Sequence, residues 1–179
     1  MEVSRPVTAA TWQEEVFDIL KRGEVKQVGY VPDAGHSYLI RQAQADPEMI
    51  DVVLTTEEEG VGLVSGAWLG GQRAVLLMQS SGVGNCVNMF SLLKMCQLPF
   101  LTLVTMRGEF GEFNPWQIPM GSTVQPVMEL MGITVFRADH ADEVAGVVQA
   151  AFTQAFLANE RVAVLLGQKL IGAKKWERD

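Results

Sequence analysis

Hydrophobic residues in this chain gather in short, nearly unbroken runs separated by amphipathic stretches. Five such runs lie at residues 25–31, 49–54, 74–78, 100–106 and 162–166, and a shorter one lies at 134–136. Strands that are covered on both faces have this composition, because neither face meets water. The pattern therefore predicts a mostly parallel sheet of about six strands.

The stretches between the runs place apolar residues at helical spacing. The clearest sets are Trp12, Val16, Ile19 and Leu20, then Tyr38, Leu39, Gln42 and Ala43, and last Val144, Val147, Val148, Ala151, Phe152, Ala155 and Phe156. Alternating strands and helices are typical of a doubly wound α/β fold with helices on both faces of the sheet. We expect one domain over residues 1–179, with a core at about residues 11–166 and a frayed tail at 173–179 unless a partner holds Trp176.

Composition and charge narrow the class of partner. The chain has 179 residues, of which 48% are hydrophobic and 20% charged, and its net charge is -7. Nucleic acids and anionic membranes need clustered Lys and Arg, and no basic stripe is present. No apolar run approaches the roughly 20 residues that cross a membrane, and the first twenty residues lack the features of a signal peptide. We therefore expect a cytoplasmic protein that binds neither nucleic acid nor membranes.

Cys86 and Cys96 are the two cysteines, ten residues apart along what the pattern predicts to be one helix. They form no CxxC pair, and no histidine nearby completes a metal site. We expect both to be buried, reduced thiols, and we expect no metal site on this chain.

Polar segments follow the predicted strands, at the edge where open α/β sheets bind ligands. They are residues 31–36 (VPDAGH), 55–57 (TTE), 79–85 (QSSGVGN) and an irregular piece from Arg107 to Ser122. A loop as long as the last is uncommon in a compact domain, and is usually either functional or packed on another subunit. We expect the chemistry of this protein to lie along this edge.

Three glutamates, Glu57 to Glu59, open a helix of about fifteen residues. Carboxylates in a first helical turn are each favoured by roughly 0.3–1 kcal/mol, and Thr56 with Glu59 has the capping-box pattern. Stabilisation of the helix start is enough to explain two of the three glutamates. Small residues crowd the same helix, namely Gly60, Gly62, Ser65, Gly66, Gly70 and Gly71. Because an interior glycine costs about 1 kcal/mol relative to alanine, we expect another group to approach this helix closely.

A glutamate at the end of the second run, a glycine nine residues later, a short apolar strand and a Ser-Gly-x-Gly-Asn turn resemble the pyrimidine-binding domain of thiamine diphosphate enzymes. Within that family the chain is similar to the α subunits of sulfopyruvate decarboxylase and to the corresponding domain of phosphonopyruvate decarboxylase. The likeness spans about residues 11–166. It is carried by residues 31–33 (VPD), 57–60 (EEEG), 79–85 (QSSGVGN), 107–109 (RGE) and 129–133 (ELMGI).

The resemblance implies that Glu57 is the catalytic carboxyl group, which hydrogen-bonds N1′ of the aminopyrimidine of thiamine diphosphate. A carboxyl group shielded from water has a raised pKa and can share a proton with a ring nitrogen, while the thiazolium serves as the electron sink for decarboxylation. By the same likeness, Pro32, Ser81, Gly82 and Asn85 bind the cofactor.

Three further residues are candidates for substrate binding. Arg107 follows the carboxyl end of a strand and could bind a doubly anionic substrate such as 3-sulfopyruvate, although a salt bridge to Glu109 or Glu112 is the alternative. Gln79 would offer a hydrogen bond to a carboxylate or sulfonate. His36 lies where related enzymes place a polar group beside the substrate, and a capping or surface histidine fits equally well.

The family's full-length members carry a second domain, in which a Gly-Asp-Gly segment and paired asparagines hold the diphosphate through a divalent metal. This chain has no Gly-Asp-Gly, and its asparagines are scattered. The resemblance therefore implies the α subunit of a split enzyme. A β subunit would hold the diphosphate and Mg2+, in a hetero-oligomer with at least two copies of each chain.

The expected reaction, a step of sulfonate metabolism, converts 3-sulfopyruvate to sulfoacetaldehyde and carbon dioxide, with phosphonopyruvate as the alternative substrate. Two other classes of function stay open. The segment Ser80 to Asn85 could bind an anion or nucleotide in a non-catalytic module, because glycine-rich turns can form concavities of N–H groups. The chain could also be a purely structural assembly subunit.

Overall fold

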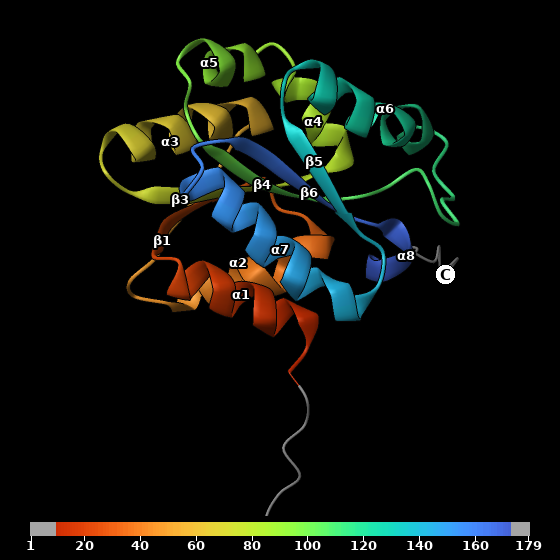
Figure 1. The fold of residues 1–179 in the computed structure, drawn as a ribbon. Helices are drawn as coiled ribbons and strands as arrows, with labels where there is room; N and C mark the ends of the chain where they lie inside the picture. The colour runs from red at the N-terminus through yellow and green to blue at the C-terminus, as the bar shows by residue number, and fades with distance from the viewer. Residues whose placement is uncertain (1–9, 173–179) are drawn as a thin grey trace, which may run out of the picture.

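Six parallel strands form the centre of the molecule, which we describe from a computed structural model over residues 10–172 (Figure 1). The strands are β1 (Val25–Tyr30), β2 (Ile50–Val53), β3 (Arg73–Gln79), β4 (Phe100–Thr105), β5 (Thr134–Ala138) and β6 (Arg161–Leu166). They lie in the order β2-β1-β3-β4-β6-β5, and every pair is parallel. The prediction of a doubly wound α/β fold with six strands is confirmed. The predicted tail at 173–179 lies outside the described residues.

Helices cover both faces of the sheet (Figure 1). One face carries α1 (Trp12–Arg22), α2 (Ser37–Ala45) and α7 (Ala141–Phe156), and the other carries α3 (Glu57–Leu69), α4 (Ser80–Cys86), α5 (Phe90–Met95) and α6 (Gln117–Leu130). The 3-10 turn η1 (Ala34–His36) follows β1, and the short helix α8 (Gln168–Ile171) follows β6.

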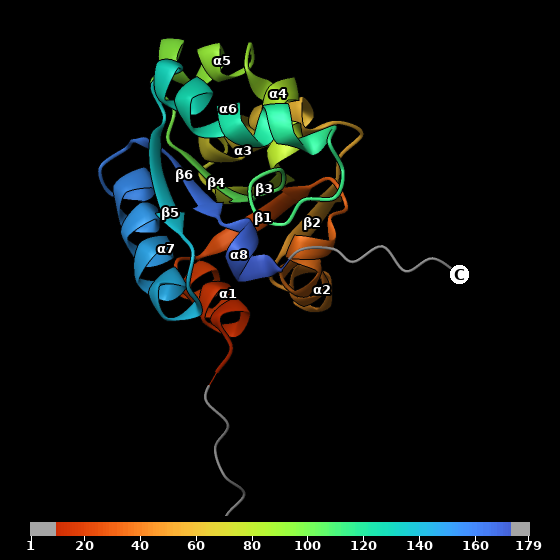
Figure 2. The ribbon, with the colours of Figure 1, turned by 90° about the vertical axis from the view of Figure 1, so that its right-hand side faces the viewer.

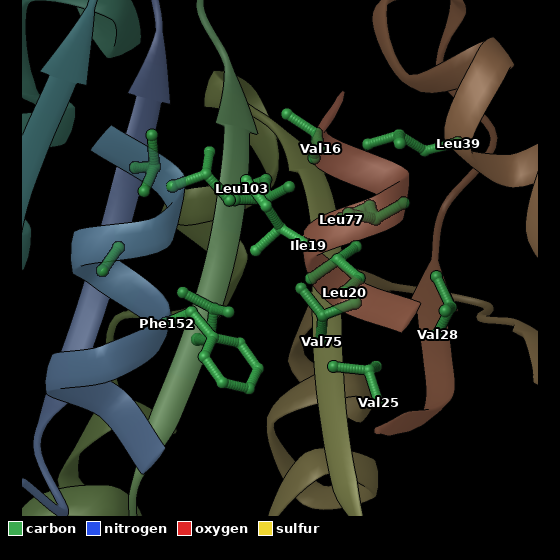
Figure 3. Close-up of a cluster of buried hydrophobic side chains, with 14 of the residues drawn as sticks. Val16, Ile19, Leu20, Val25, Val28, Leu39, Val75, Leu77, Leu103 and Phe152 are labelled. Atoms are coloured by element: carbon green, nitrogen blue, oxygen red, sulfur yellow. The ribbon is translucent and has the colours of Figure 1, made fainter. Parts of the chain in front are cut away.

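The hydrophobic core lies in two layers, one on each side of the sheet. In the first layer, Val16 and Ile19 of α1 and Phe152 of α7 belong to one buried cluster with Leu77 of β3 and Leu103 of β4 (Figure 3). These strand residues are fully buried, as the unbroken apolar runs predicted. The sheet is therefore a rigid platform for the segments at its carboxyl edge.

The chain changes faces between β1 and β3. The helix after β1 packs on one side of the sheet and the helix after β3 on the other, although the two strands are neighbours. A crevice opens between the two connections at such a point, and open α/β sheets bind ligands there. Asp33 follows β1 and Gln79 ends β3, so both residues lie where the chain changes faces.

Two sequence expectations about local structure were wrong. The irregular segment after β4 ends at Trp116, because α6 begins at Gln117 and already includes the proline and glycine that read as a loop. Pro119 lies in the first helical turn, where a backbone N–H has no partner within the helix. Cys86 is buried as expected, but Cys96 is exposed. The predicted single helix is interrupted between α4 and α5, so the two cysteines do not lie on one helix face.

The expected close approach to α3 occurs at Gly60. A Cβ at this position would clash with Leu76 and lie 2.8 Å from Cδ1 of Leu54. At Gly62 and Gly66 a Cβ would meet no described atom within 4 Å. The helix therefore needs glycine at position 60 to pack against the sheet, whereas positions 62 and 66 face open space in this chain.

We predict opposite effects for two glycine substitutions in this one helix. Gly60→Ala should destabilise the chain by about 1–3 kcal/mol, because the added methyl overpacks the contact between α3 and β3. Gly62→Ala should be neutral or stabilise it by up to about 1 kcal/mol, because alanine is the better helix former. Urea unfolding of the purified chain measures both, and equal stabilities of the two variants would contradict the described packing of α3.

Candidate functional site

Glu57 is the first residue of α3, and its side chain is directed into the protein with 9% exposure. Oε2 accepts a hydrogen bond from Nδ2 of Asn85 at 2.8 Å. A Cβ at Gly82 would lie 2.5 Å from Cδ and Oε1 of Glu57, so this carboxyl group rests against the backbone of α4. Oε1 accepts no hydrogen bond from residues 10–172. The structure thus brings together three of the residues predicted from the sequence.

The two following glutamates are exposed. The Thr56 hydroxyl makes no capping hydrogen bond, and Glu59 instead accepts from the backbone N–H of Thr55 at 2.8 Å. The predicted capping box is therefore wrong, because the Glu59 carboxylate reaches one residue further back than the pattern assumes.

Asp33 joins the carboxyl ends of three adjacent strands. Oδ2 accepts hydrogen bonds from the Thr105 hydroxyl at 2.7 Å and from the backbone N–H of Gly35 at 3.1 Å. Oδ1 accepts from Nε2 of Gln79 at 3.2 Å, and Oε1 of Gln79 accepts from the Ser81 hydroxyl at 2.9 Å. Burial alone would raise the pKa of Asp33, but the hydrogen bond from Thr105, the nearby His36 and the hydrogen bonds from Gln79 and Gly35 together hold the pKa below its ordinary value. Asp33 is therefore an ionised carboxylate at the centre of a chain of hydrogen bonds.

His36 lies beneath this network rather than on the surface. It is 1% exposed, and its Nε2 lies 3.0 Å from the carbonyl oxygen of Leu103 and 3.2 Å from that of Met78. Burial lowers the pKa of His36, so the ring is neutral and carries its hydrogen on the nitrogen that faces the two carbonyls. Nδ1 has no hydrogen-bond partner among the described residues. The histidine expected beside the substrate thus connects β3 and β4 in the interior.

Arg107 is 7% exposed and forms a two-pronged ion pair with Glu112. Nε donates to Oε2 and Nη2 donates to Oε1, both at 2.6 Å. The hydrogen bonds from Arg107 lower the pKa of Glu112 to about 2, against the opposing effect of burial. The alternative raised from the sequence therefore holds for Glu112, and the charge of Arg107 is neutralised within the chain.

Gln168, a buried residue that sequence reasoning missed, is the first residue of α8, the short helix labelled in Figure 2, and it fixes the segment after β4 to this helix. Its Oε1 accepts from the backbone N–H groups of Glu109 at 3.0 Å and Phe110 at 2.9 Å, and its Nε2 donates to Glu112 at 2.8 Å. The available signal was a polar residue two positions after the last apolar strand. Gly108 has a φ of +81°, and a side chain there would clash with the backbone at Gln117. This segment is accordingly a fixed wall.

A groove of about 810 Å³ lies between α4 and the start of α6. Its lining residues are Ser81, Gly84, Asn85, Pro115, Trp116, Pro119, Met120 and Thr123. Trp116 is 83% exposed and belongs to the wall that Gln168 and Glu112 hold in place. Asn85 both lines the groove and contacts Glu57, so the groove lies next to the buried carboxyl group. Pro32 lies elsewhere, in a separate hollow of about 310 Å³ beside Ser37 and Arg41.

The thiol of Cys86 is buried in α4. Burial, with the nearby charges of Glu57 and Glu58, raises the pKa of the Cys86 thiol to about 12, so Cys86 is a neutral thiol near neutral pH. Within residues 10–172, no three His, Cys, Asp or Glu side chains gather closely enough to hold a metal ion. No helix in the same range is both long and apolar enough to span a bilayer.

Comparison with known proteins places the chain in a family. It is 30% identical over 165 residues to sulfopyruvate decarboxylase subunit alpha of Methanocaldococcus jannaschii, covering 92% of this chain and 95% of that protein. It is 33% identical over 167 residues to the subunit of the same name from Methanococcus maripaludis, covering 93% and 97%. This chain belongs to the sulfopyruvate decarboxylase α subunit family. No protein-family model matches it.

Two more distant relatives of this chain are longer proteins. Sulfopyruvate decarboxylase of Methanosarcina acetivorans is 32% identical over 124 residues, which cover 68% of this chain and 31% of that protein. Phosphonopyruvate decarboxylase of Streptomyces viridochromogenes is 36% identical over 108 residues, which cover 59% and 27%. Each matched region is therefore less than a third of the longer relative.

The fold has a solved counterpart in 2-oxoglutarate:ferredoxin oxidoreductase from Magnetococcus marinus. The TM-score is 0.68 at 12% identity, and the match covers 94% of this chain but about a third (33%) of that one. At this identity the likeness concerns the fold alone.

We predict that Glu112→Gln destabilises the chain by on the order of 3 kcal/mol at neutral pH, because it leaves Arg107 buried without its counter-charge. The lowered pKa of Glu112 also means that its ion pair stabilises the native chain above the ordinary value of 4.5, and that this contribution is lost as the pH falls toward about 2. Wild type should therefore lose more stability than Glu112→Gln between about pH 5 and pH 3.

Urea unfolding at several pH values measures both effects. Glu129→Gln is the matched control, since Glu129 is an exposed residue whose Oε1 accepts a hydrogen bond from Gln125. If Glu112→Gln and Glu129→Gln behaved alike, the Arg107–Glu112 pair would not be the contact that holds this segment.

Proposed function

We propose that this chain is the α subunit of a cytoplasmic, thiamine diphosphate-dependent decarboxylase that converts 3-sulfopyruvate to sulfoacetaldehyde and carbon dioxide. Membership of the sulfopyruvate decarboxylase α subunit family supports the reaction. The position of Glu57 carries the proposal, because this residue is nine-tenths buried and one of its carboxyl oxygens has no partner among the described residues.

The residues around Glu57 fit the pyrimidine end of the cofactor. Oε1 of Glu57 would hold a proton shared with a ring nitrogen, while Asn85 keeps Oε2 occupied and so fixes the direction of the carboxyl group. Gly82 allows the carboxyl group to lie against α4, since any side chain there would displace it. When bound, thiamine diphosphate supplies a thiazolium that takes up the electron pair released as carbon dioxide leaves. Ser81 and Asn85 would contact the ligand from the groove.

A partner subunit completes the site in this proposal. The described residues offer no cluster of metal ligands, so the diphosphate and Mg2+ would be held by a β subunit with the Gly-Asp-Gly and asparagine motif. The length of the Methanosarcina acetivorans relative supports this division, because it has room for a second domain in one chain. We expect a hetero-oligomer with at least two copies of each subunit.

The proposed function has two alternatives, a different substrate and a non-catalytic role. Phosphonopyruvate is the second candidate substrate, supported by the 36% identity to a phosphonopyruvate decarboxylase. A non-catalytic anion site in the segment Ser80 to Asn85 is disfavoured, because the backbone at Gly82 is covered by the Glu57 carboxyl group. An anion placed there would need the space that the Glu57 side chain already occupies.

We predict that Glu57→Gln lowers carbon dioxide release by a factor of about 10²–10⁴, because glutamine retains the shape of the side chain but cannot carry the shared proton. The measurement is turnover by the complex reconstituted from this chain, its β subunit, thiamine diphosphate and Mg2+. Glu58→Gln is the matched control, since that neighbouring glutamate is exposed, and it should retain activity. Full activity of Glu57→Gln would remove the basis of the proposal.

Substrate choice is tested on the same reconstituted complex. We expect the highest kcat/KM with 3-sulfopyruvate, a lower value with phosphonopyruvate and the lowest with pyruvate, which lacks the second acid group. Carbon dioxide release measures all three. A preference for phosphonopyruvate would keep the reaction type and correct the substrate, whereas no release with any of them would overturn the proposed function.

A further inference from the structure

The direction of each hydrogen bond in the Asp33 network follows from the chemistry of its members. An ionised carboxylate can only accept hydrogen bonds, so the group that Gln79 turns toward Asp33 must be its NH₂. The amide oxygen of Gln79 then faces the other way, and it accepts from the Ser81 hydroxyl at 2.9 Å. The single hydrogen of Ser81 is therefore committed to Gln79.

Ser81 also lines the groove, and there its oxygen retains only lone pairs. The other hydroxyl group of the groove is in the same state, because Thr123 donates its hydrogen to the backbone carbonyl oxygens of Pro119 and Met120, each at 3.1 Å. The remaining walls include Pro115, Trp116 and Asn85, and Nδ2 of Asn85 donates one hydrogen to Glu57. The groove therefore combines apolar surface with hydroxyl oxygens that can accept hydrogen bonds but have none left to donate.

We propose that Asp33 is a positioning residue that sets the Ser81 hydroxyl as a hydrogen-bond acceptor toward the groove. Ser81 would then accept a hydrogen bond from an N–H or O–H donor of a flat, apolar-faced group that enters the groove. This inference deepens the proposed function and rests on it for the identity of the ligand. It also alters the sequence-based expectation for Gln79, whose amide orients Ser81.

The isosteric change Asp33→Asn should reverse the network. Asparagine would keep its oxygen toward the donors Thr105 and Gly35, and would present its NH₂ to Gln79. Gln79 would then turn its oxygen to residue 33 and its NH₂ to Ser81, which frees the Ser81 hydrogen to point into the groove. Replacing one carboxylate oxygen of Asp33 by NH₂ would thus convert the Ser81 hydroxyl from a hydrogen-bond acceptor into a donor toward the groove.

A double-mutant cycle of Asp33→Asn and Ser81→Ala tests this relation. The probe is thiamine diphosphate with Mg2+, titrated calorimetrically into the complex reconstituted with the β subunit. We expect each single variant to weaken binding by about tenfold, the equivalent of one hydrogen bond, and the double variant to bind no more weakly than Ser81→Ala alone. Asp51→Asn is the matched control, because Asp51 accepts from the Tyr30 hydroxyl at 2.9 Å and has no hydrogen bond to Gln79. It should bind as wild type does.

A second readout needs no ligand. It is the side-chain NH₂ signal of Gln79 in the full chain, identified by its loss in Gln79→Ala. This signal should respond strongly to Ser81→Ala when Asp33→Asn is also present, and weakly when Asp33 is retained. That pattern reports which end of the amide faces Ser81, and a merely structural role of Asp33 would not produce it.

The two readouts separate the possible failures. If wild type does not bind thiamine diphosphate, the proposed function fails, and the amide signal still decides the inference. The inference is overturned if Asp33→Asn weakens binding by the same factor whether Ser81 is retained or replaced by alanine. It is also overturned if the amide signal responds equally with and without Asp33→Asn, because Asp33 then does not act through Ser81.

Discussion

All six strands run in the same direction, so their carboxyl ends meet along one edge of the sheet. Asp33, Gln79 and Thr105 are far apart in the chain, yet they lie within hydrogen-bond distance because β1, β3 and β4 are neighbours in the sheet. The strand order also places the change of faces between β1 and β3, beside the same residues. The candidate site thus depends on a platform whose apolar core leaves its strands little freedom to shift.

Glycine decides how closely α3 and α4 approach the rest of the molecule. At Gly60 the missing side chain lets α3 settle onto β3, and at Gly82 it lets the Glu57 carboxyl group lie against the backbone of α4. The first contact serves packing, and the second brings an acid with one unpaired oxygen next to the groove. In both places the conformational freedom of glycine is less important than its lack of a Cβ.

Charged groups at this edge are mostly neutralised within the chain. Arg107 pairs with Glu112, and Arg137 pairs with Glu109 and Asp139. These ion pairs and Gln168 hold the segment after β4 in place as a wall. Arg107 therefore makes a structural contact, whereas the sequence had suggested that it binds the substrate. Asp33 accepts hydrogen bonds from uncharged donors, one of them Gln79, whose amide oxygen in turn accepts from Ser81.

The hydrophobic pattern by itself determined the six strands, the helices α1, α2 and α7 and the edge that carries the polar segments, because strands buried on both faces need unbroken apolar runs. Resemblance to a family selected Glu57, Gly82 and Asn85. Only the tertiary structure decided that His36 lies in the interior, that Arg107 pairs with Glu112 and that Asp33 centres a network. Strand order and side-chain direction arise from contacts between residues distant in the chain, and a periodic pattern along one dimension does not contain them.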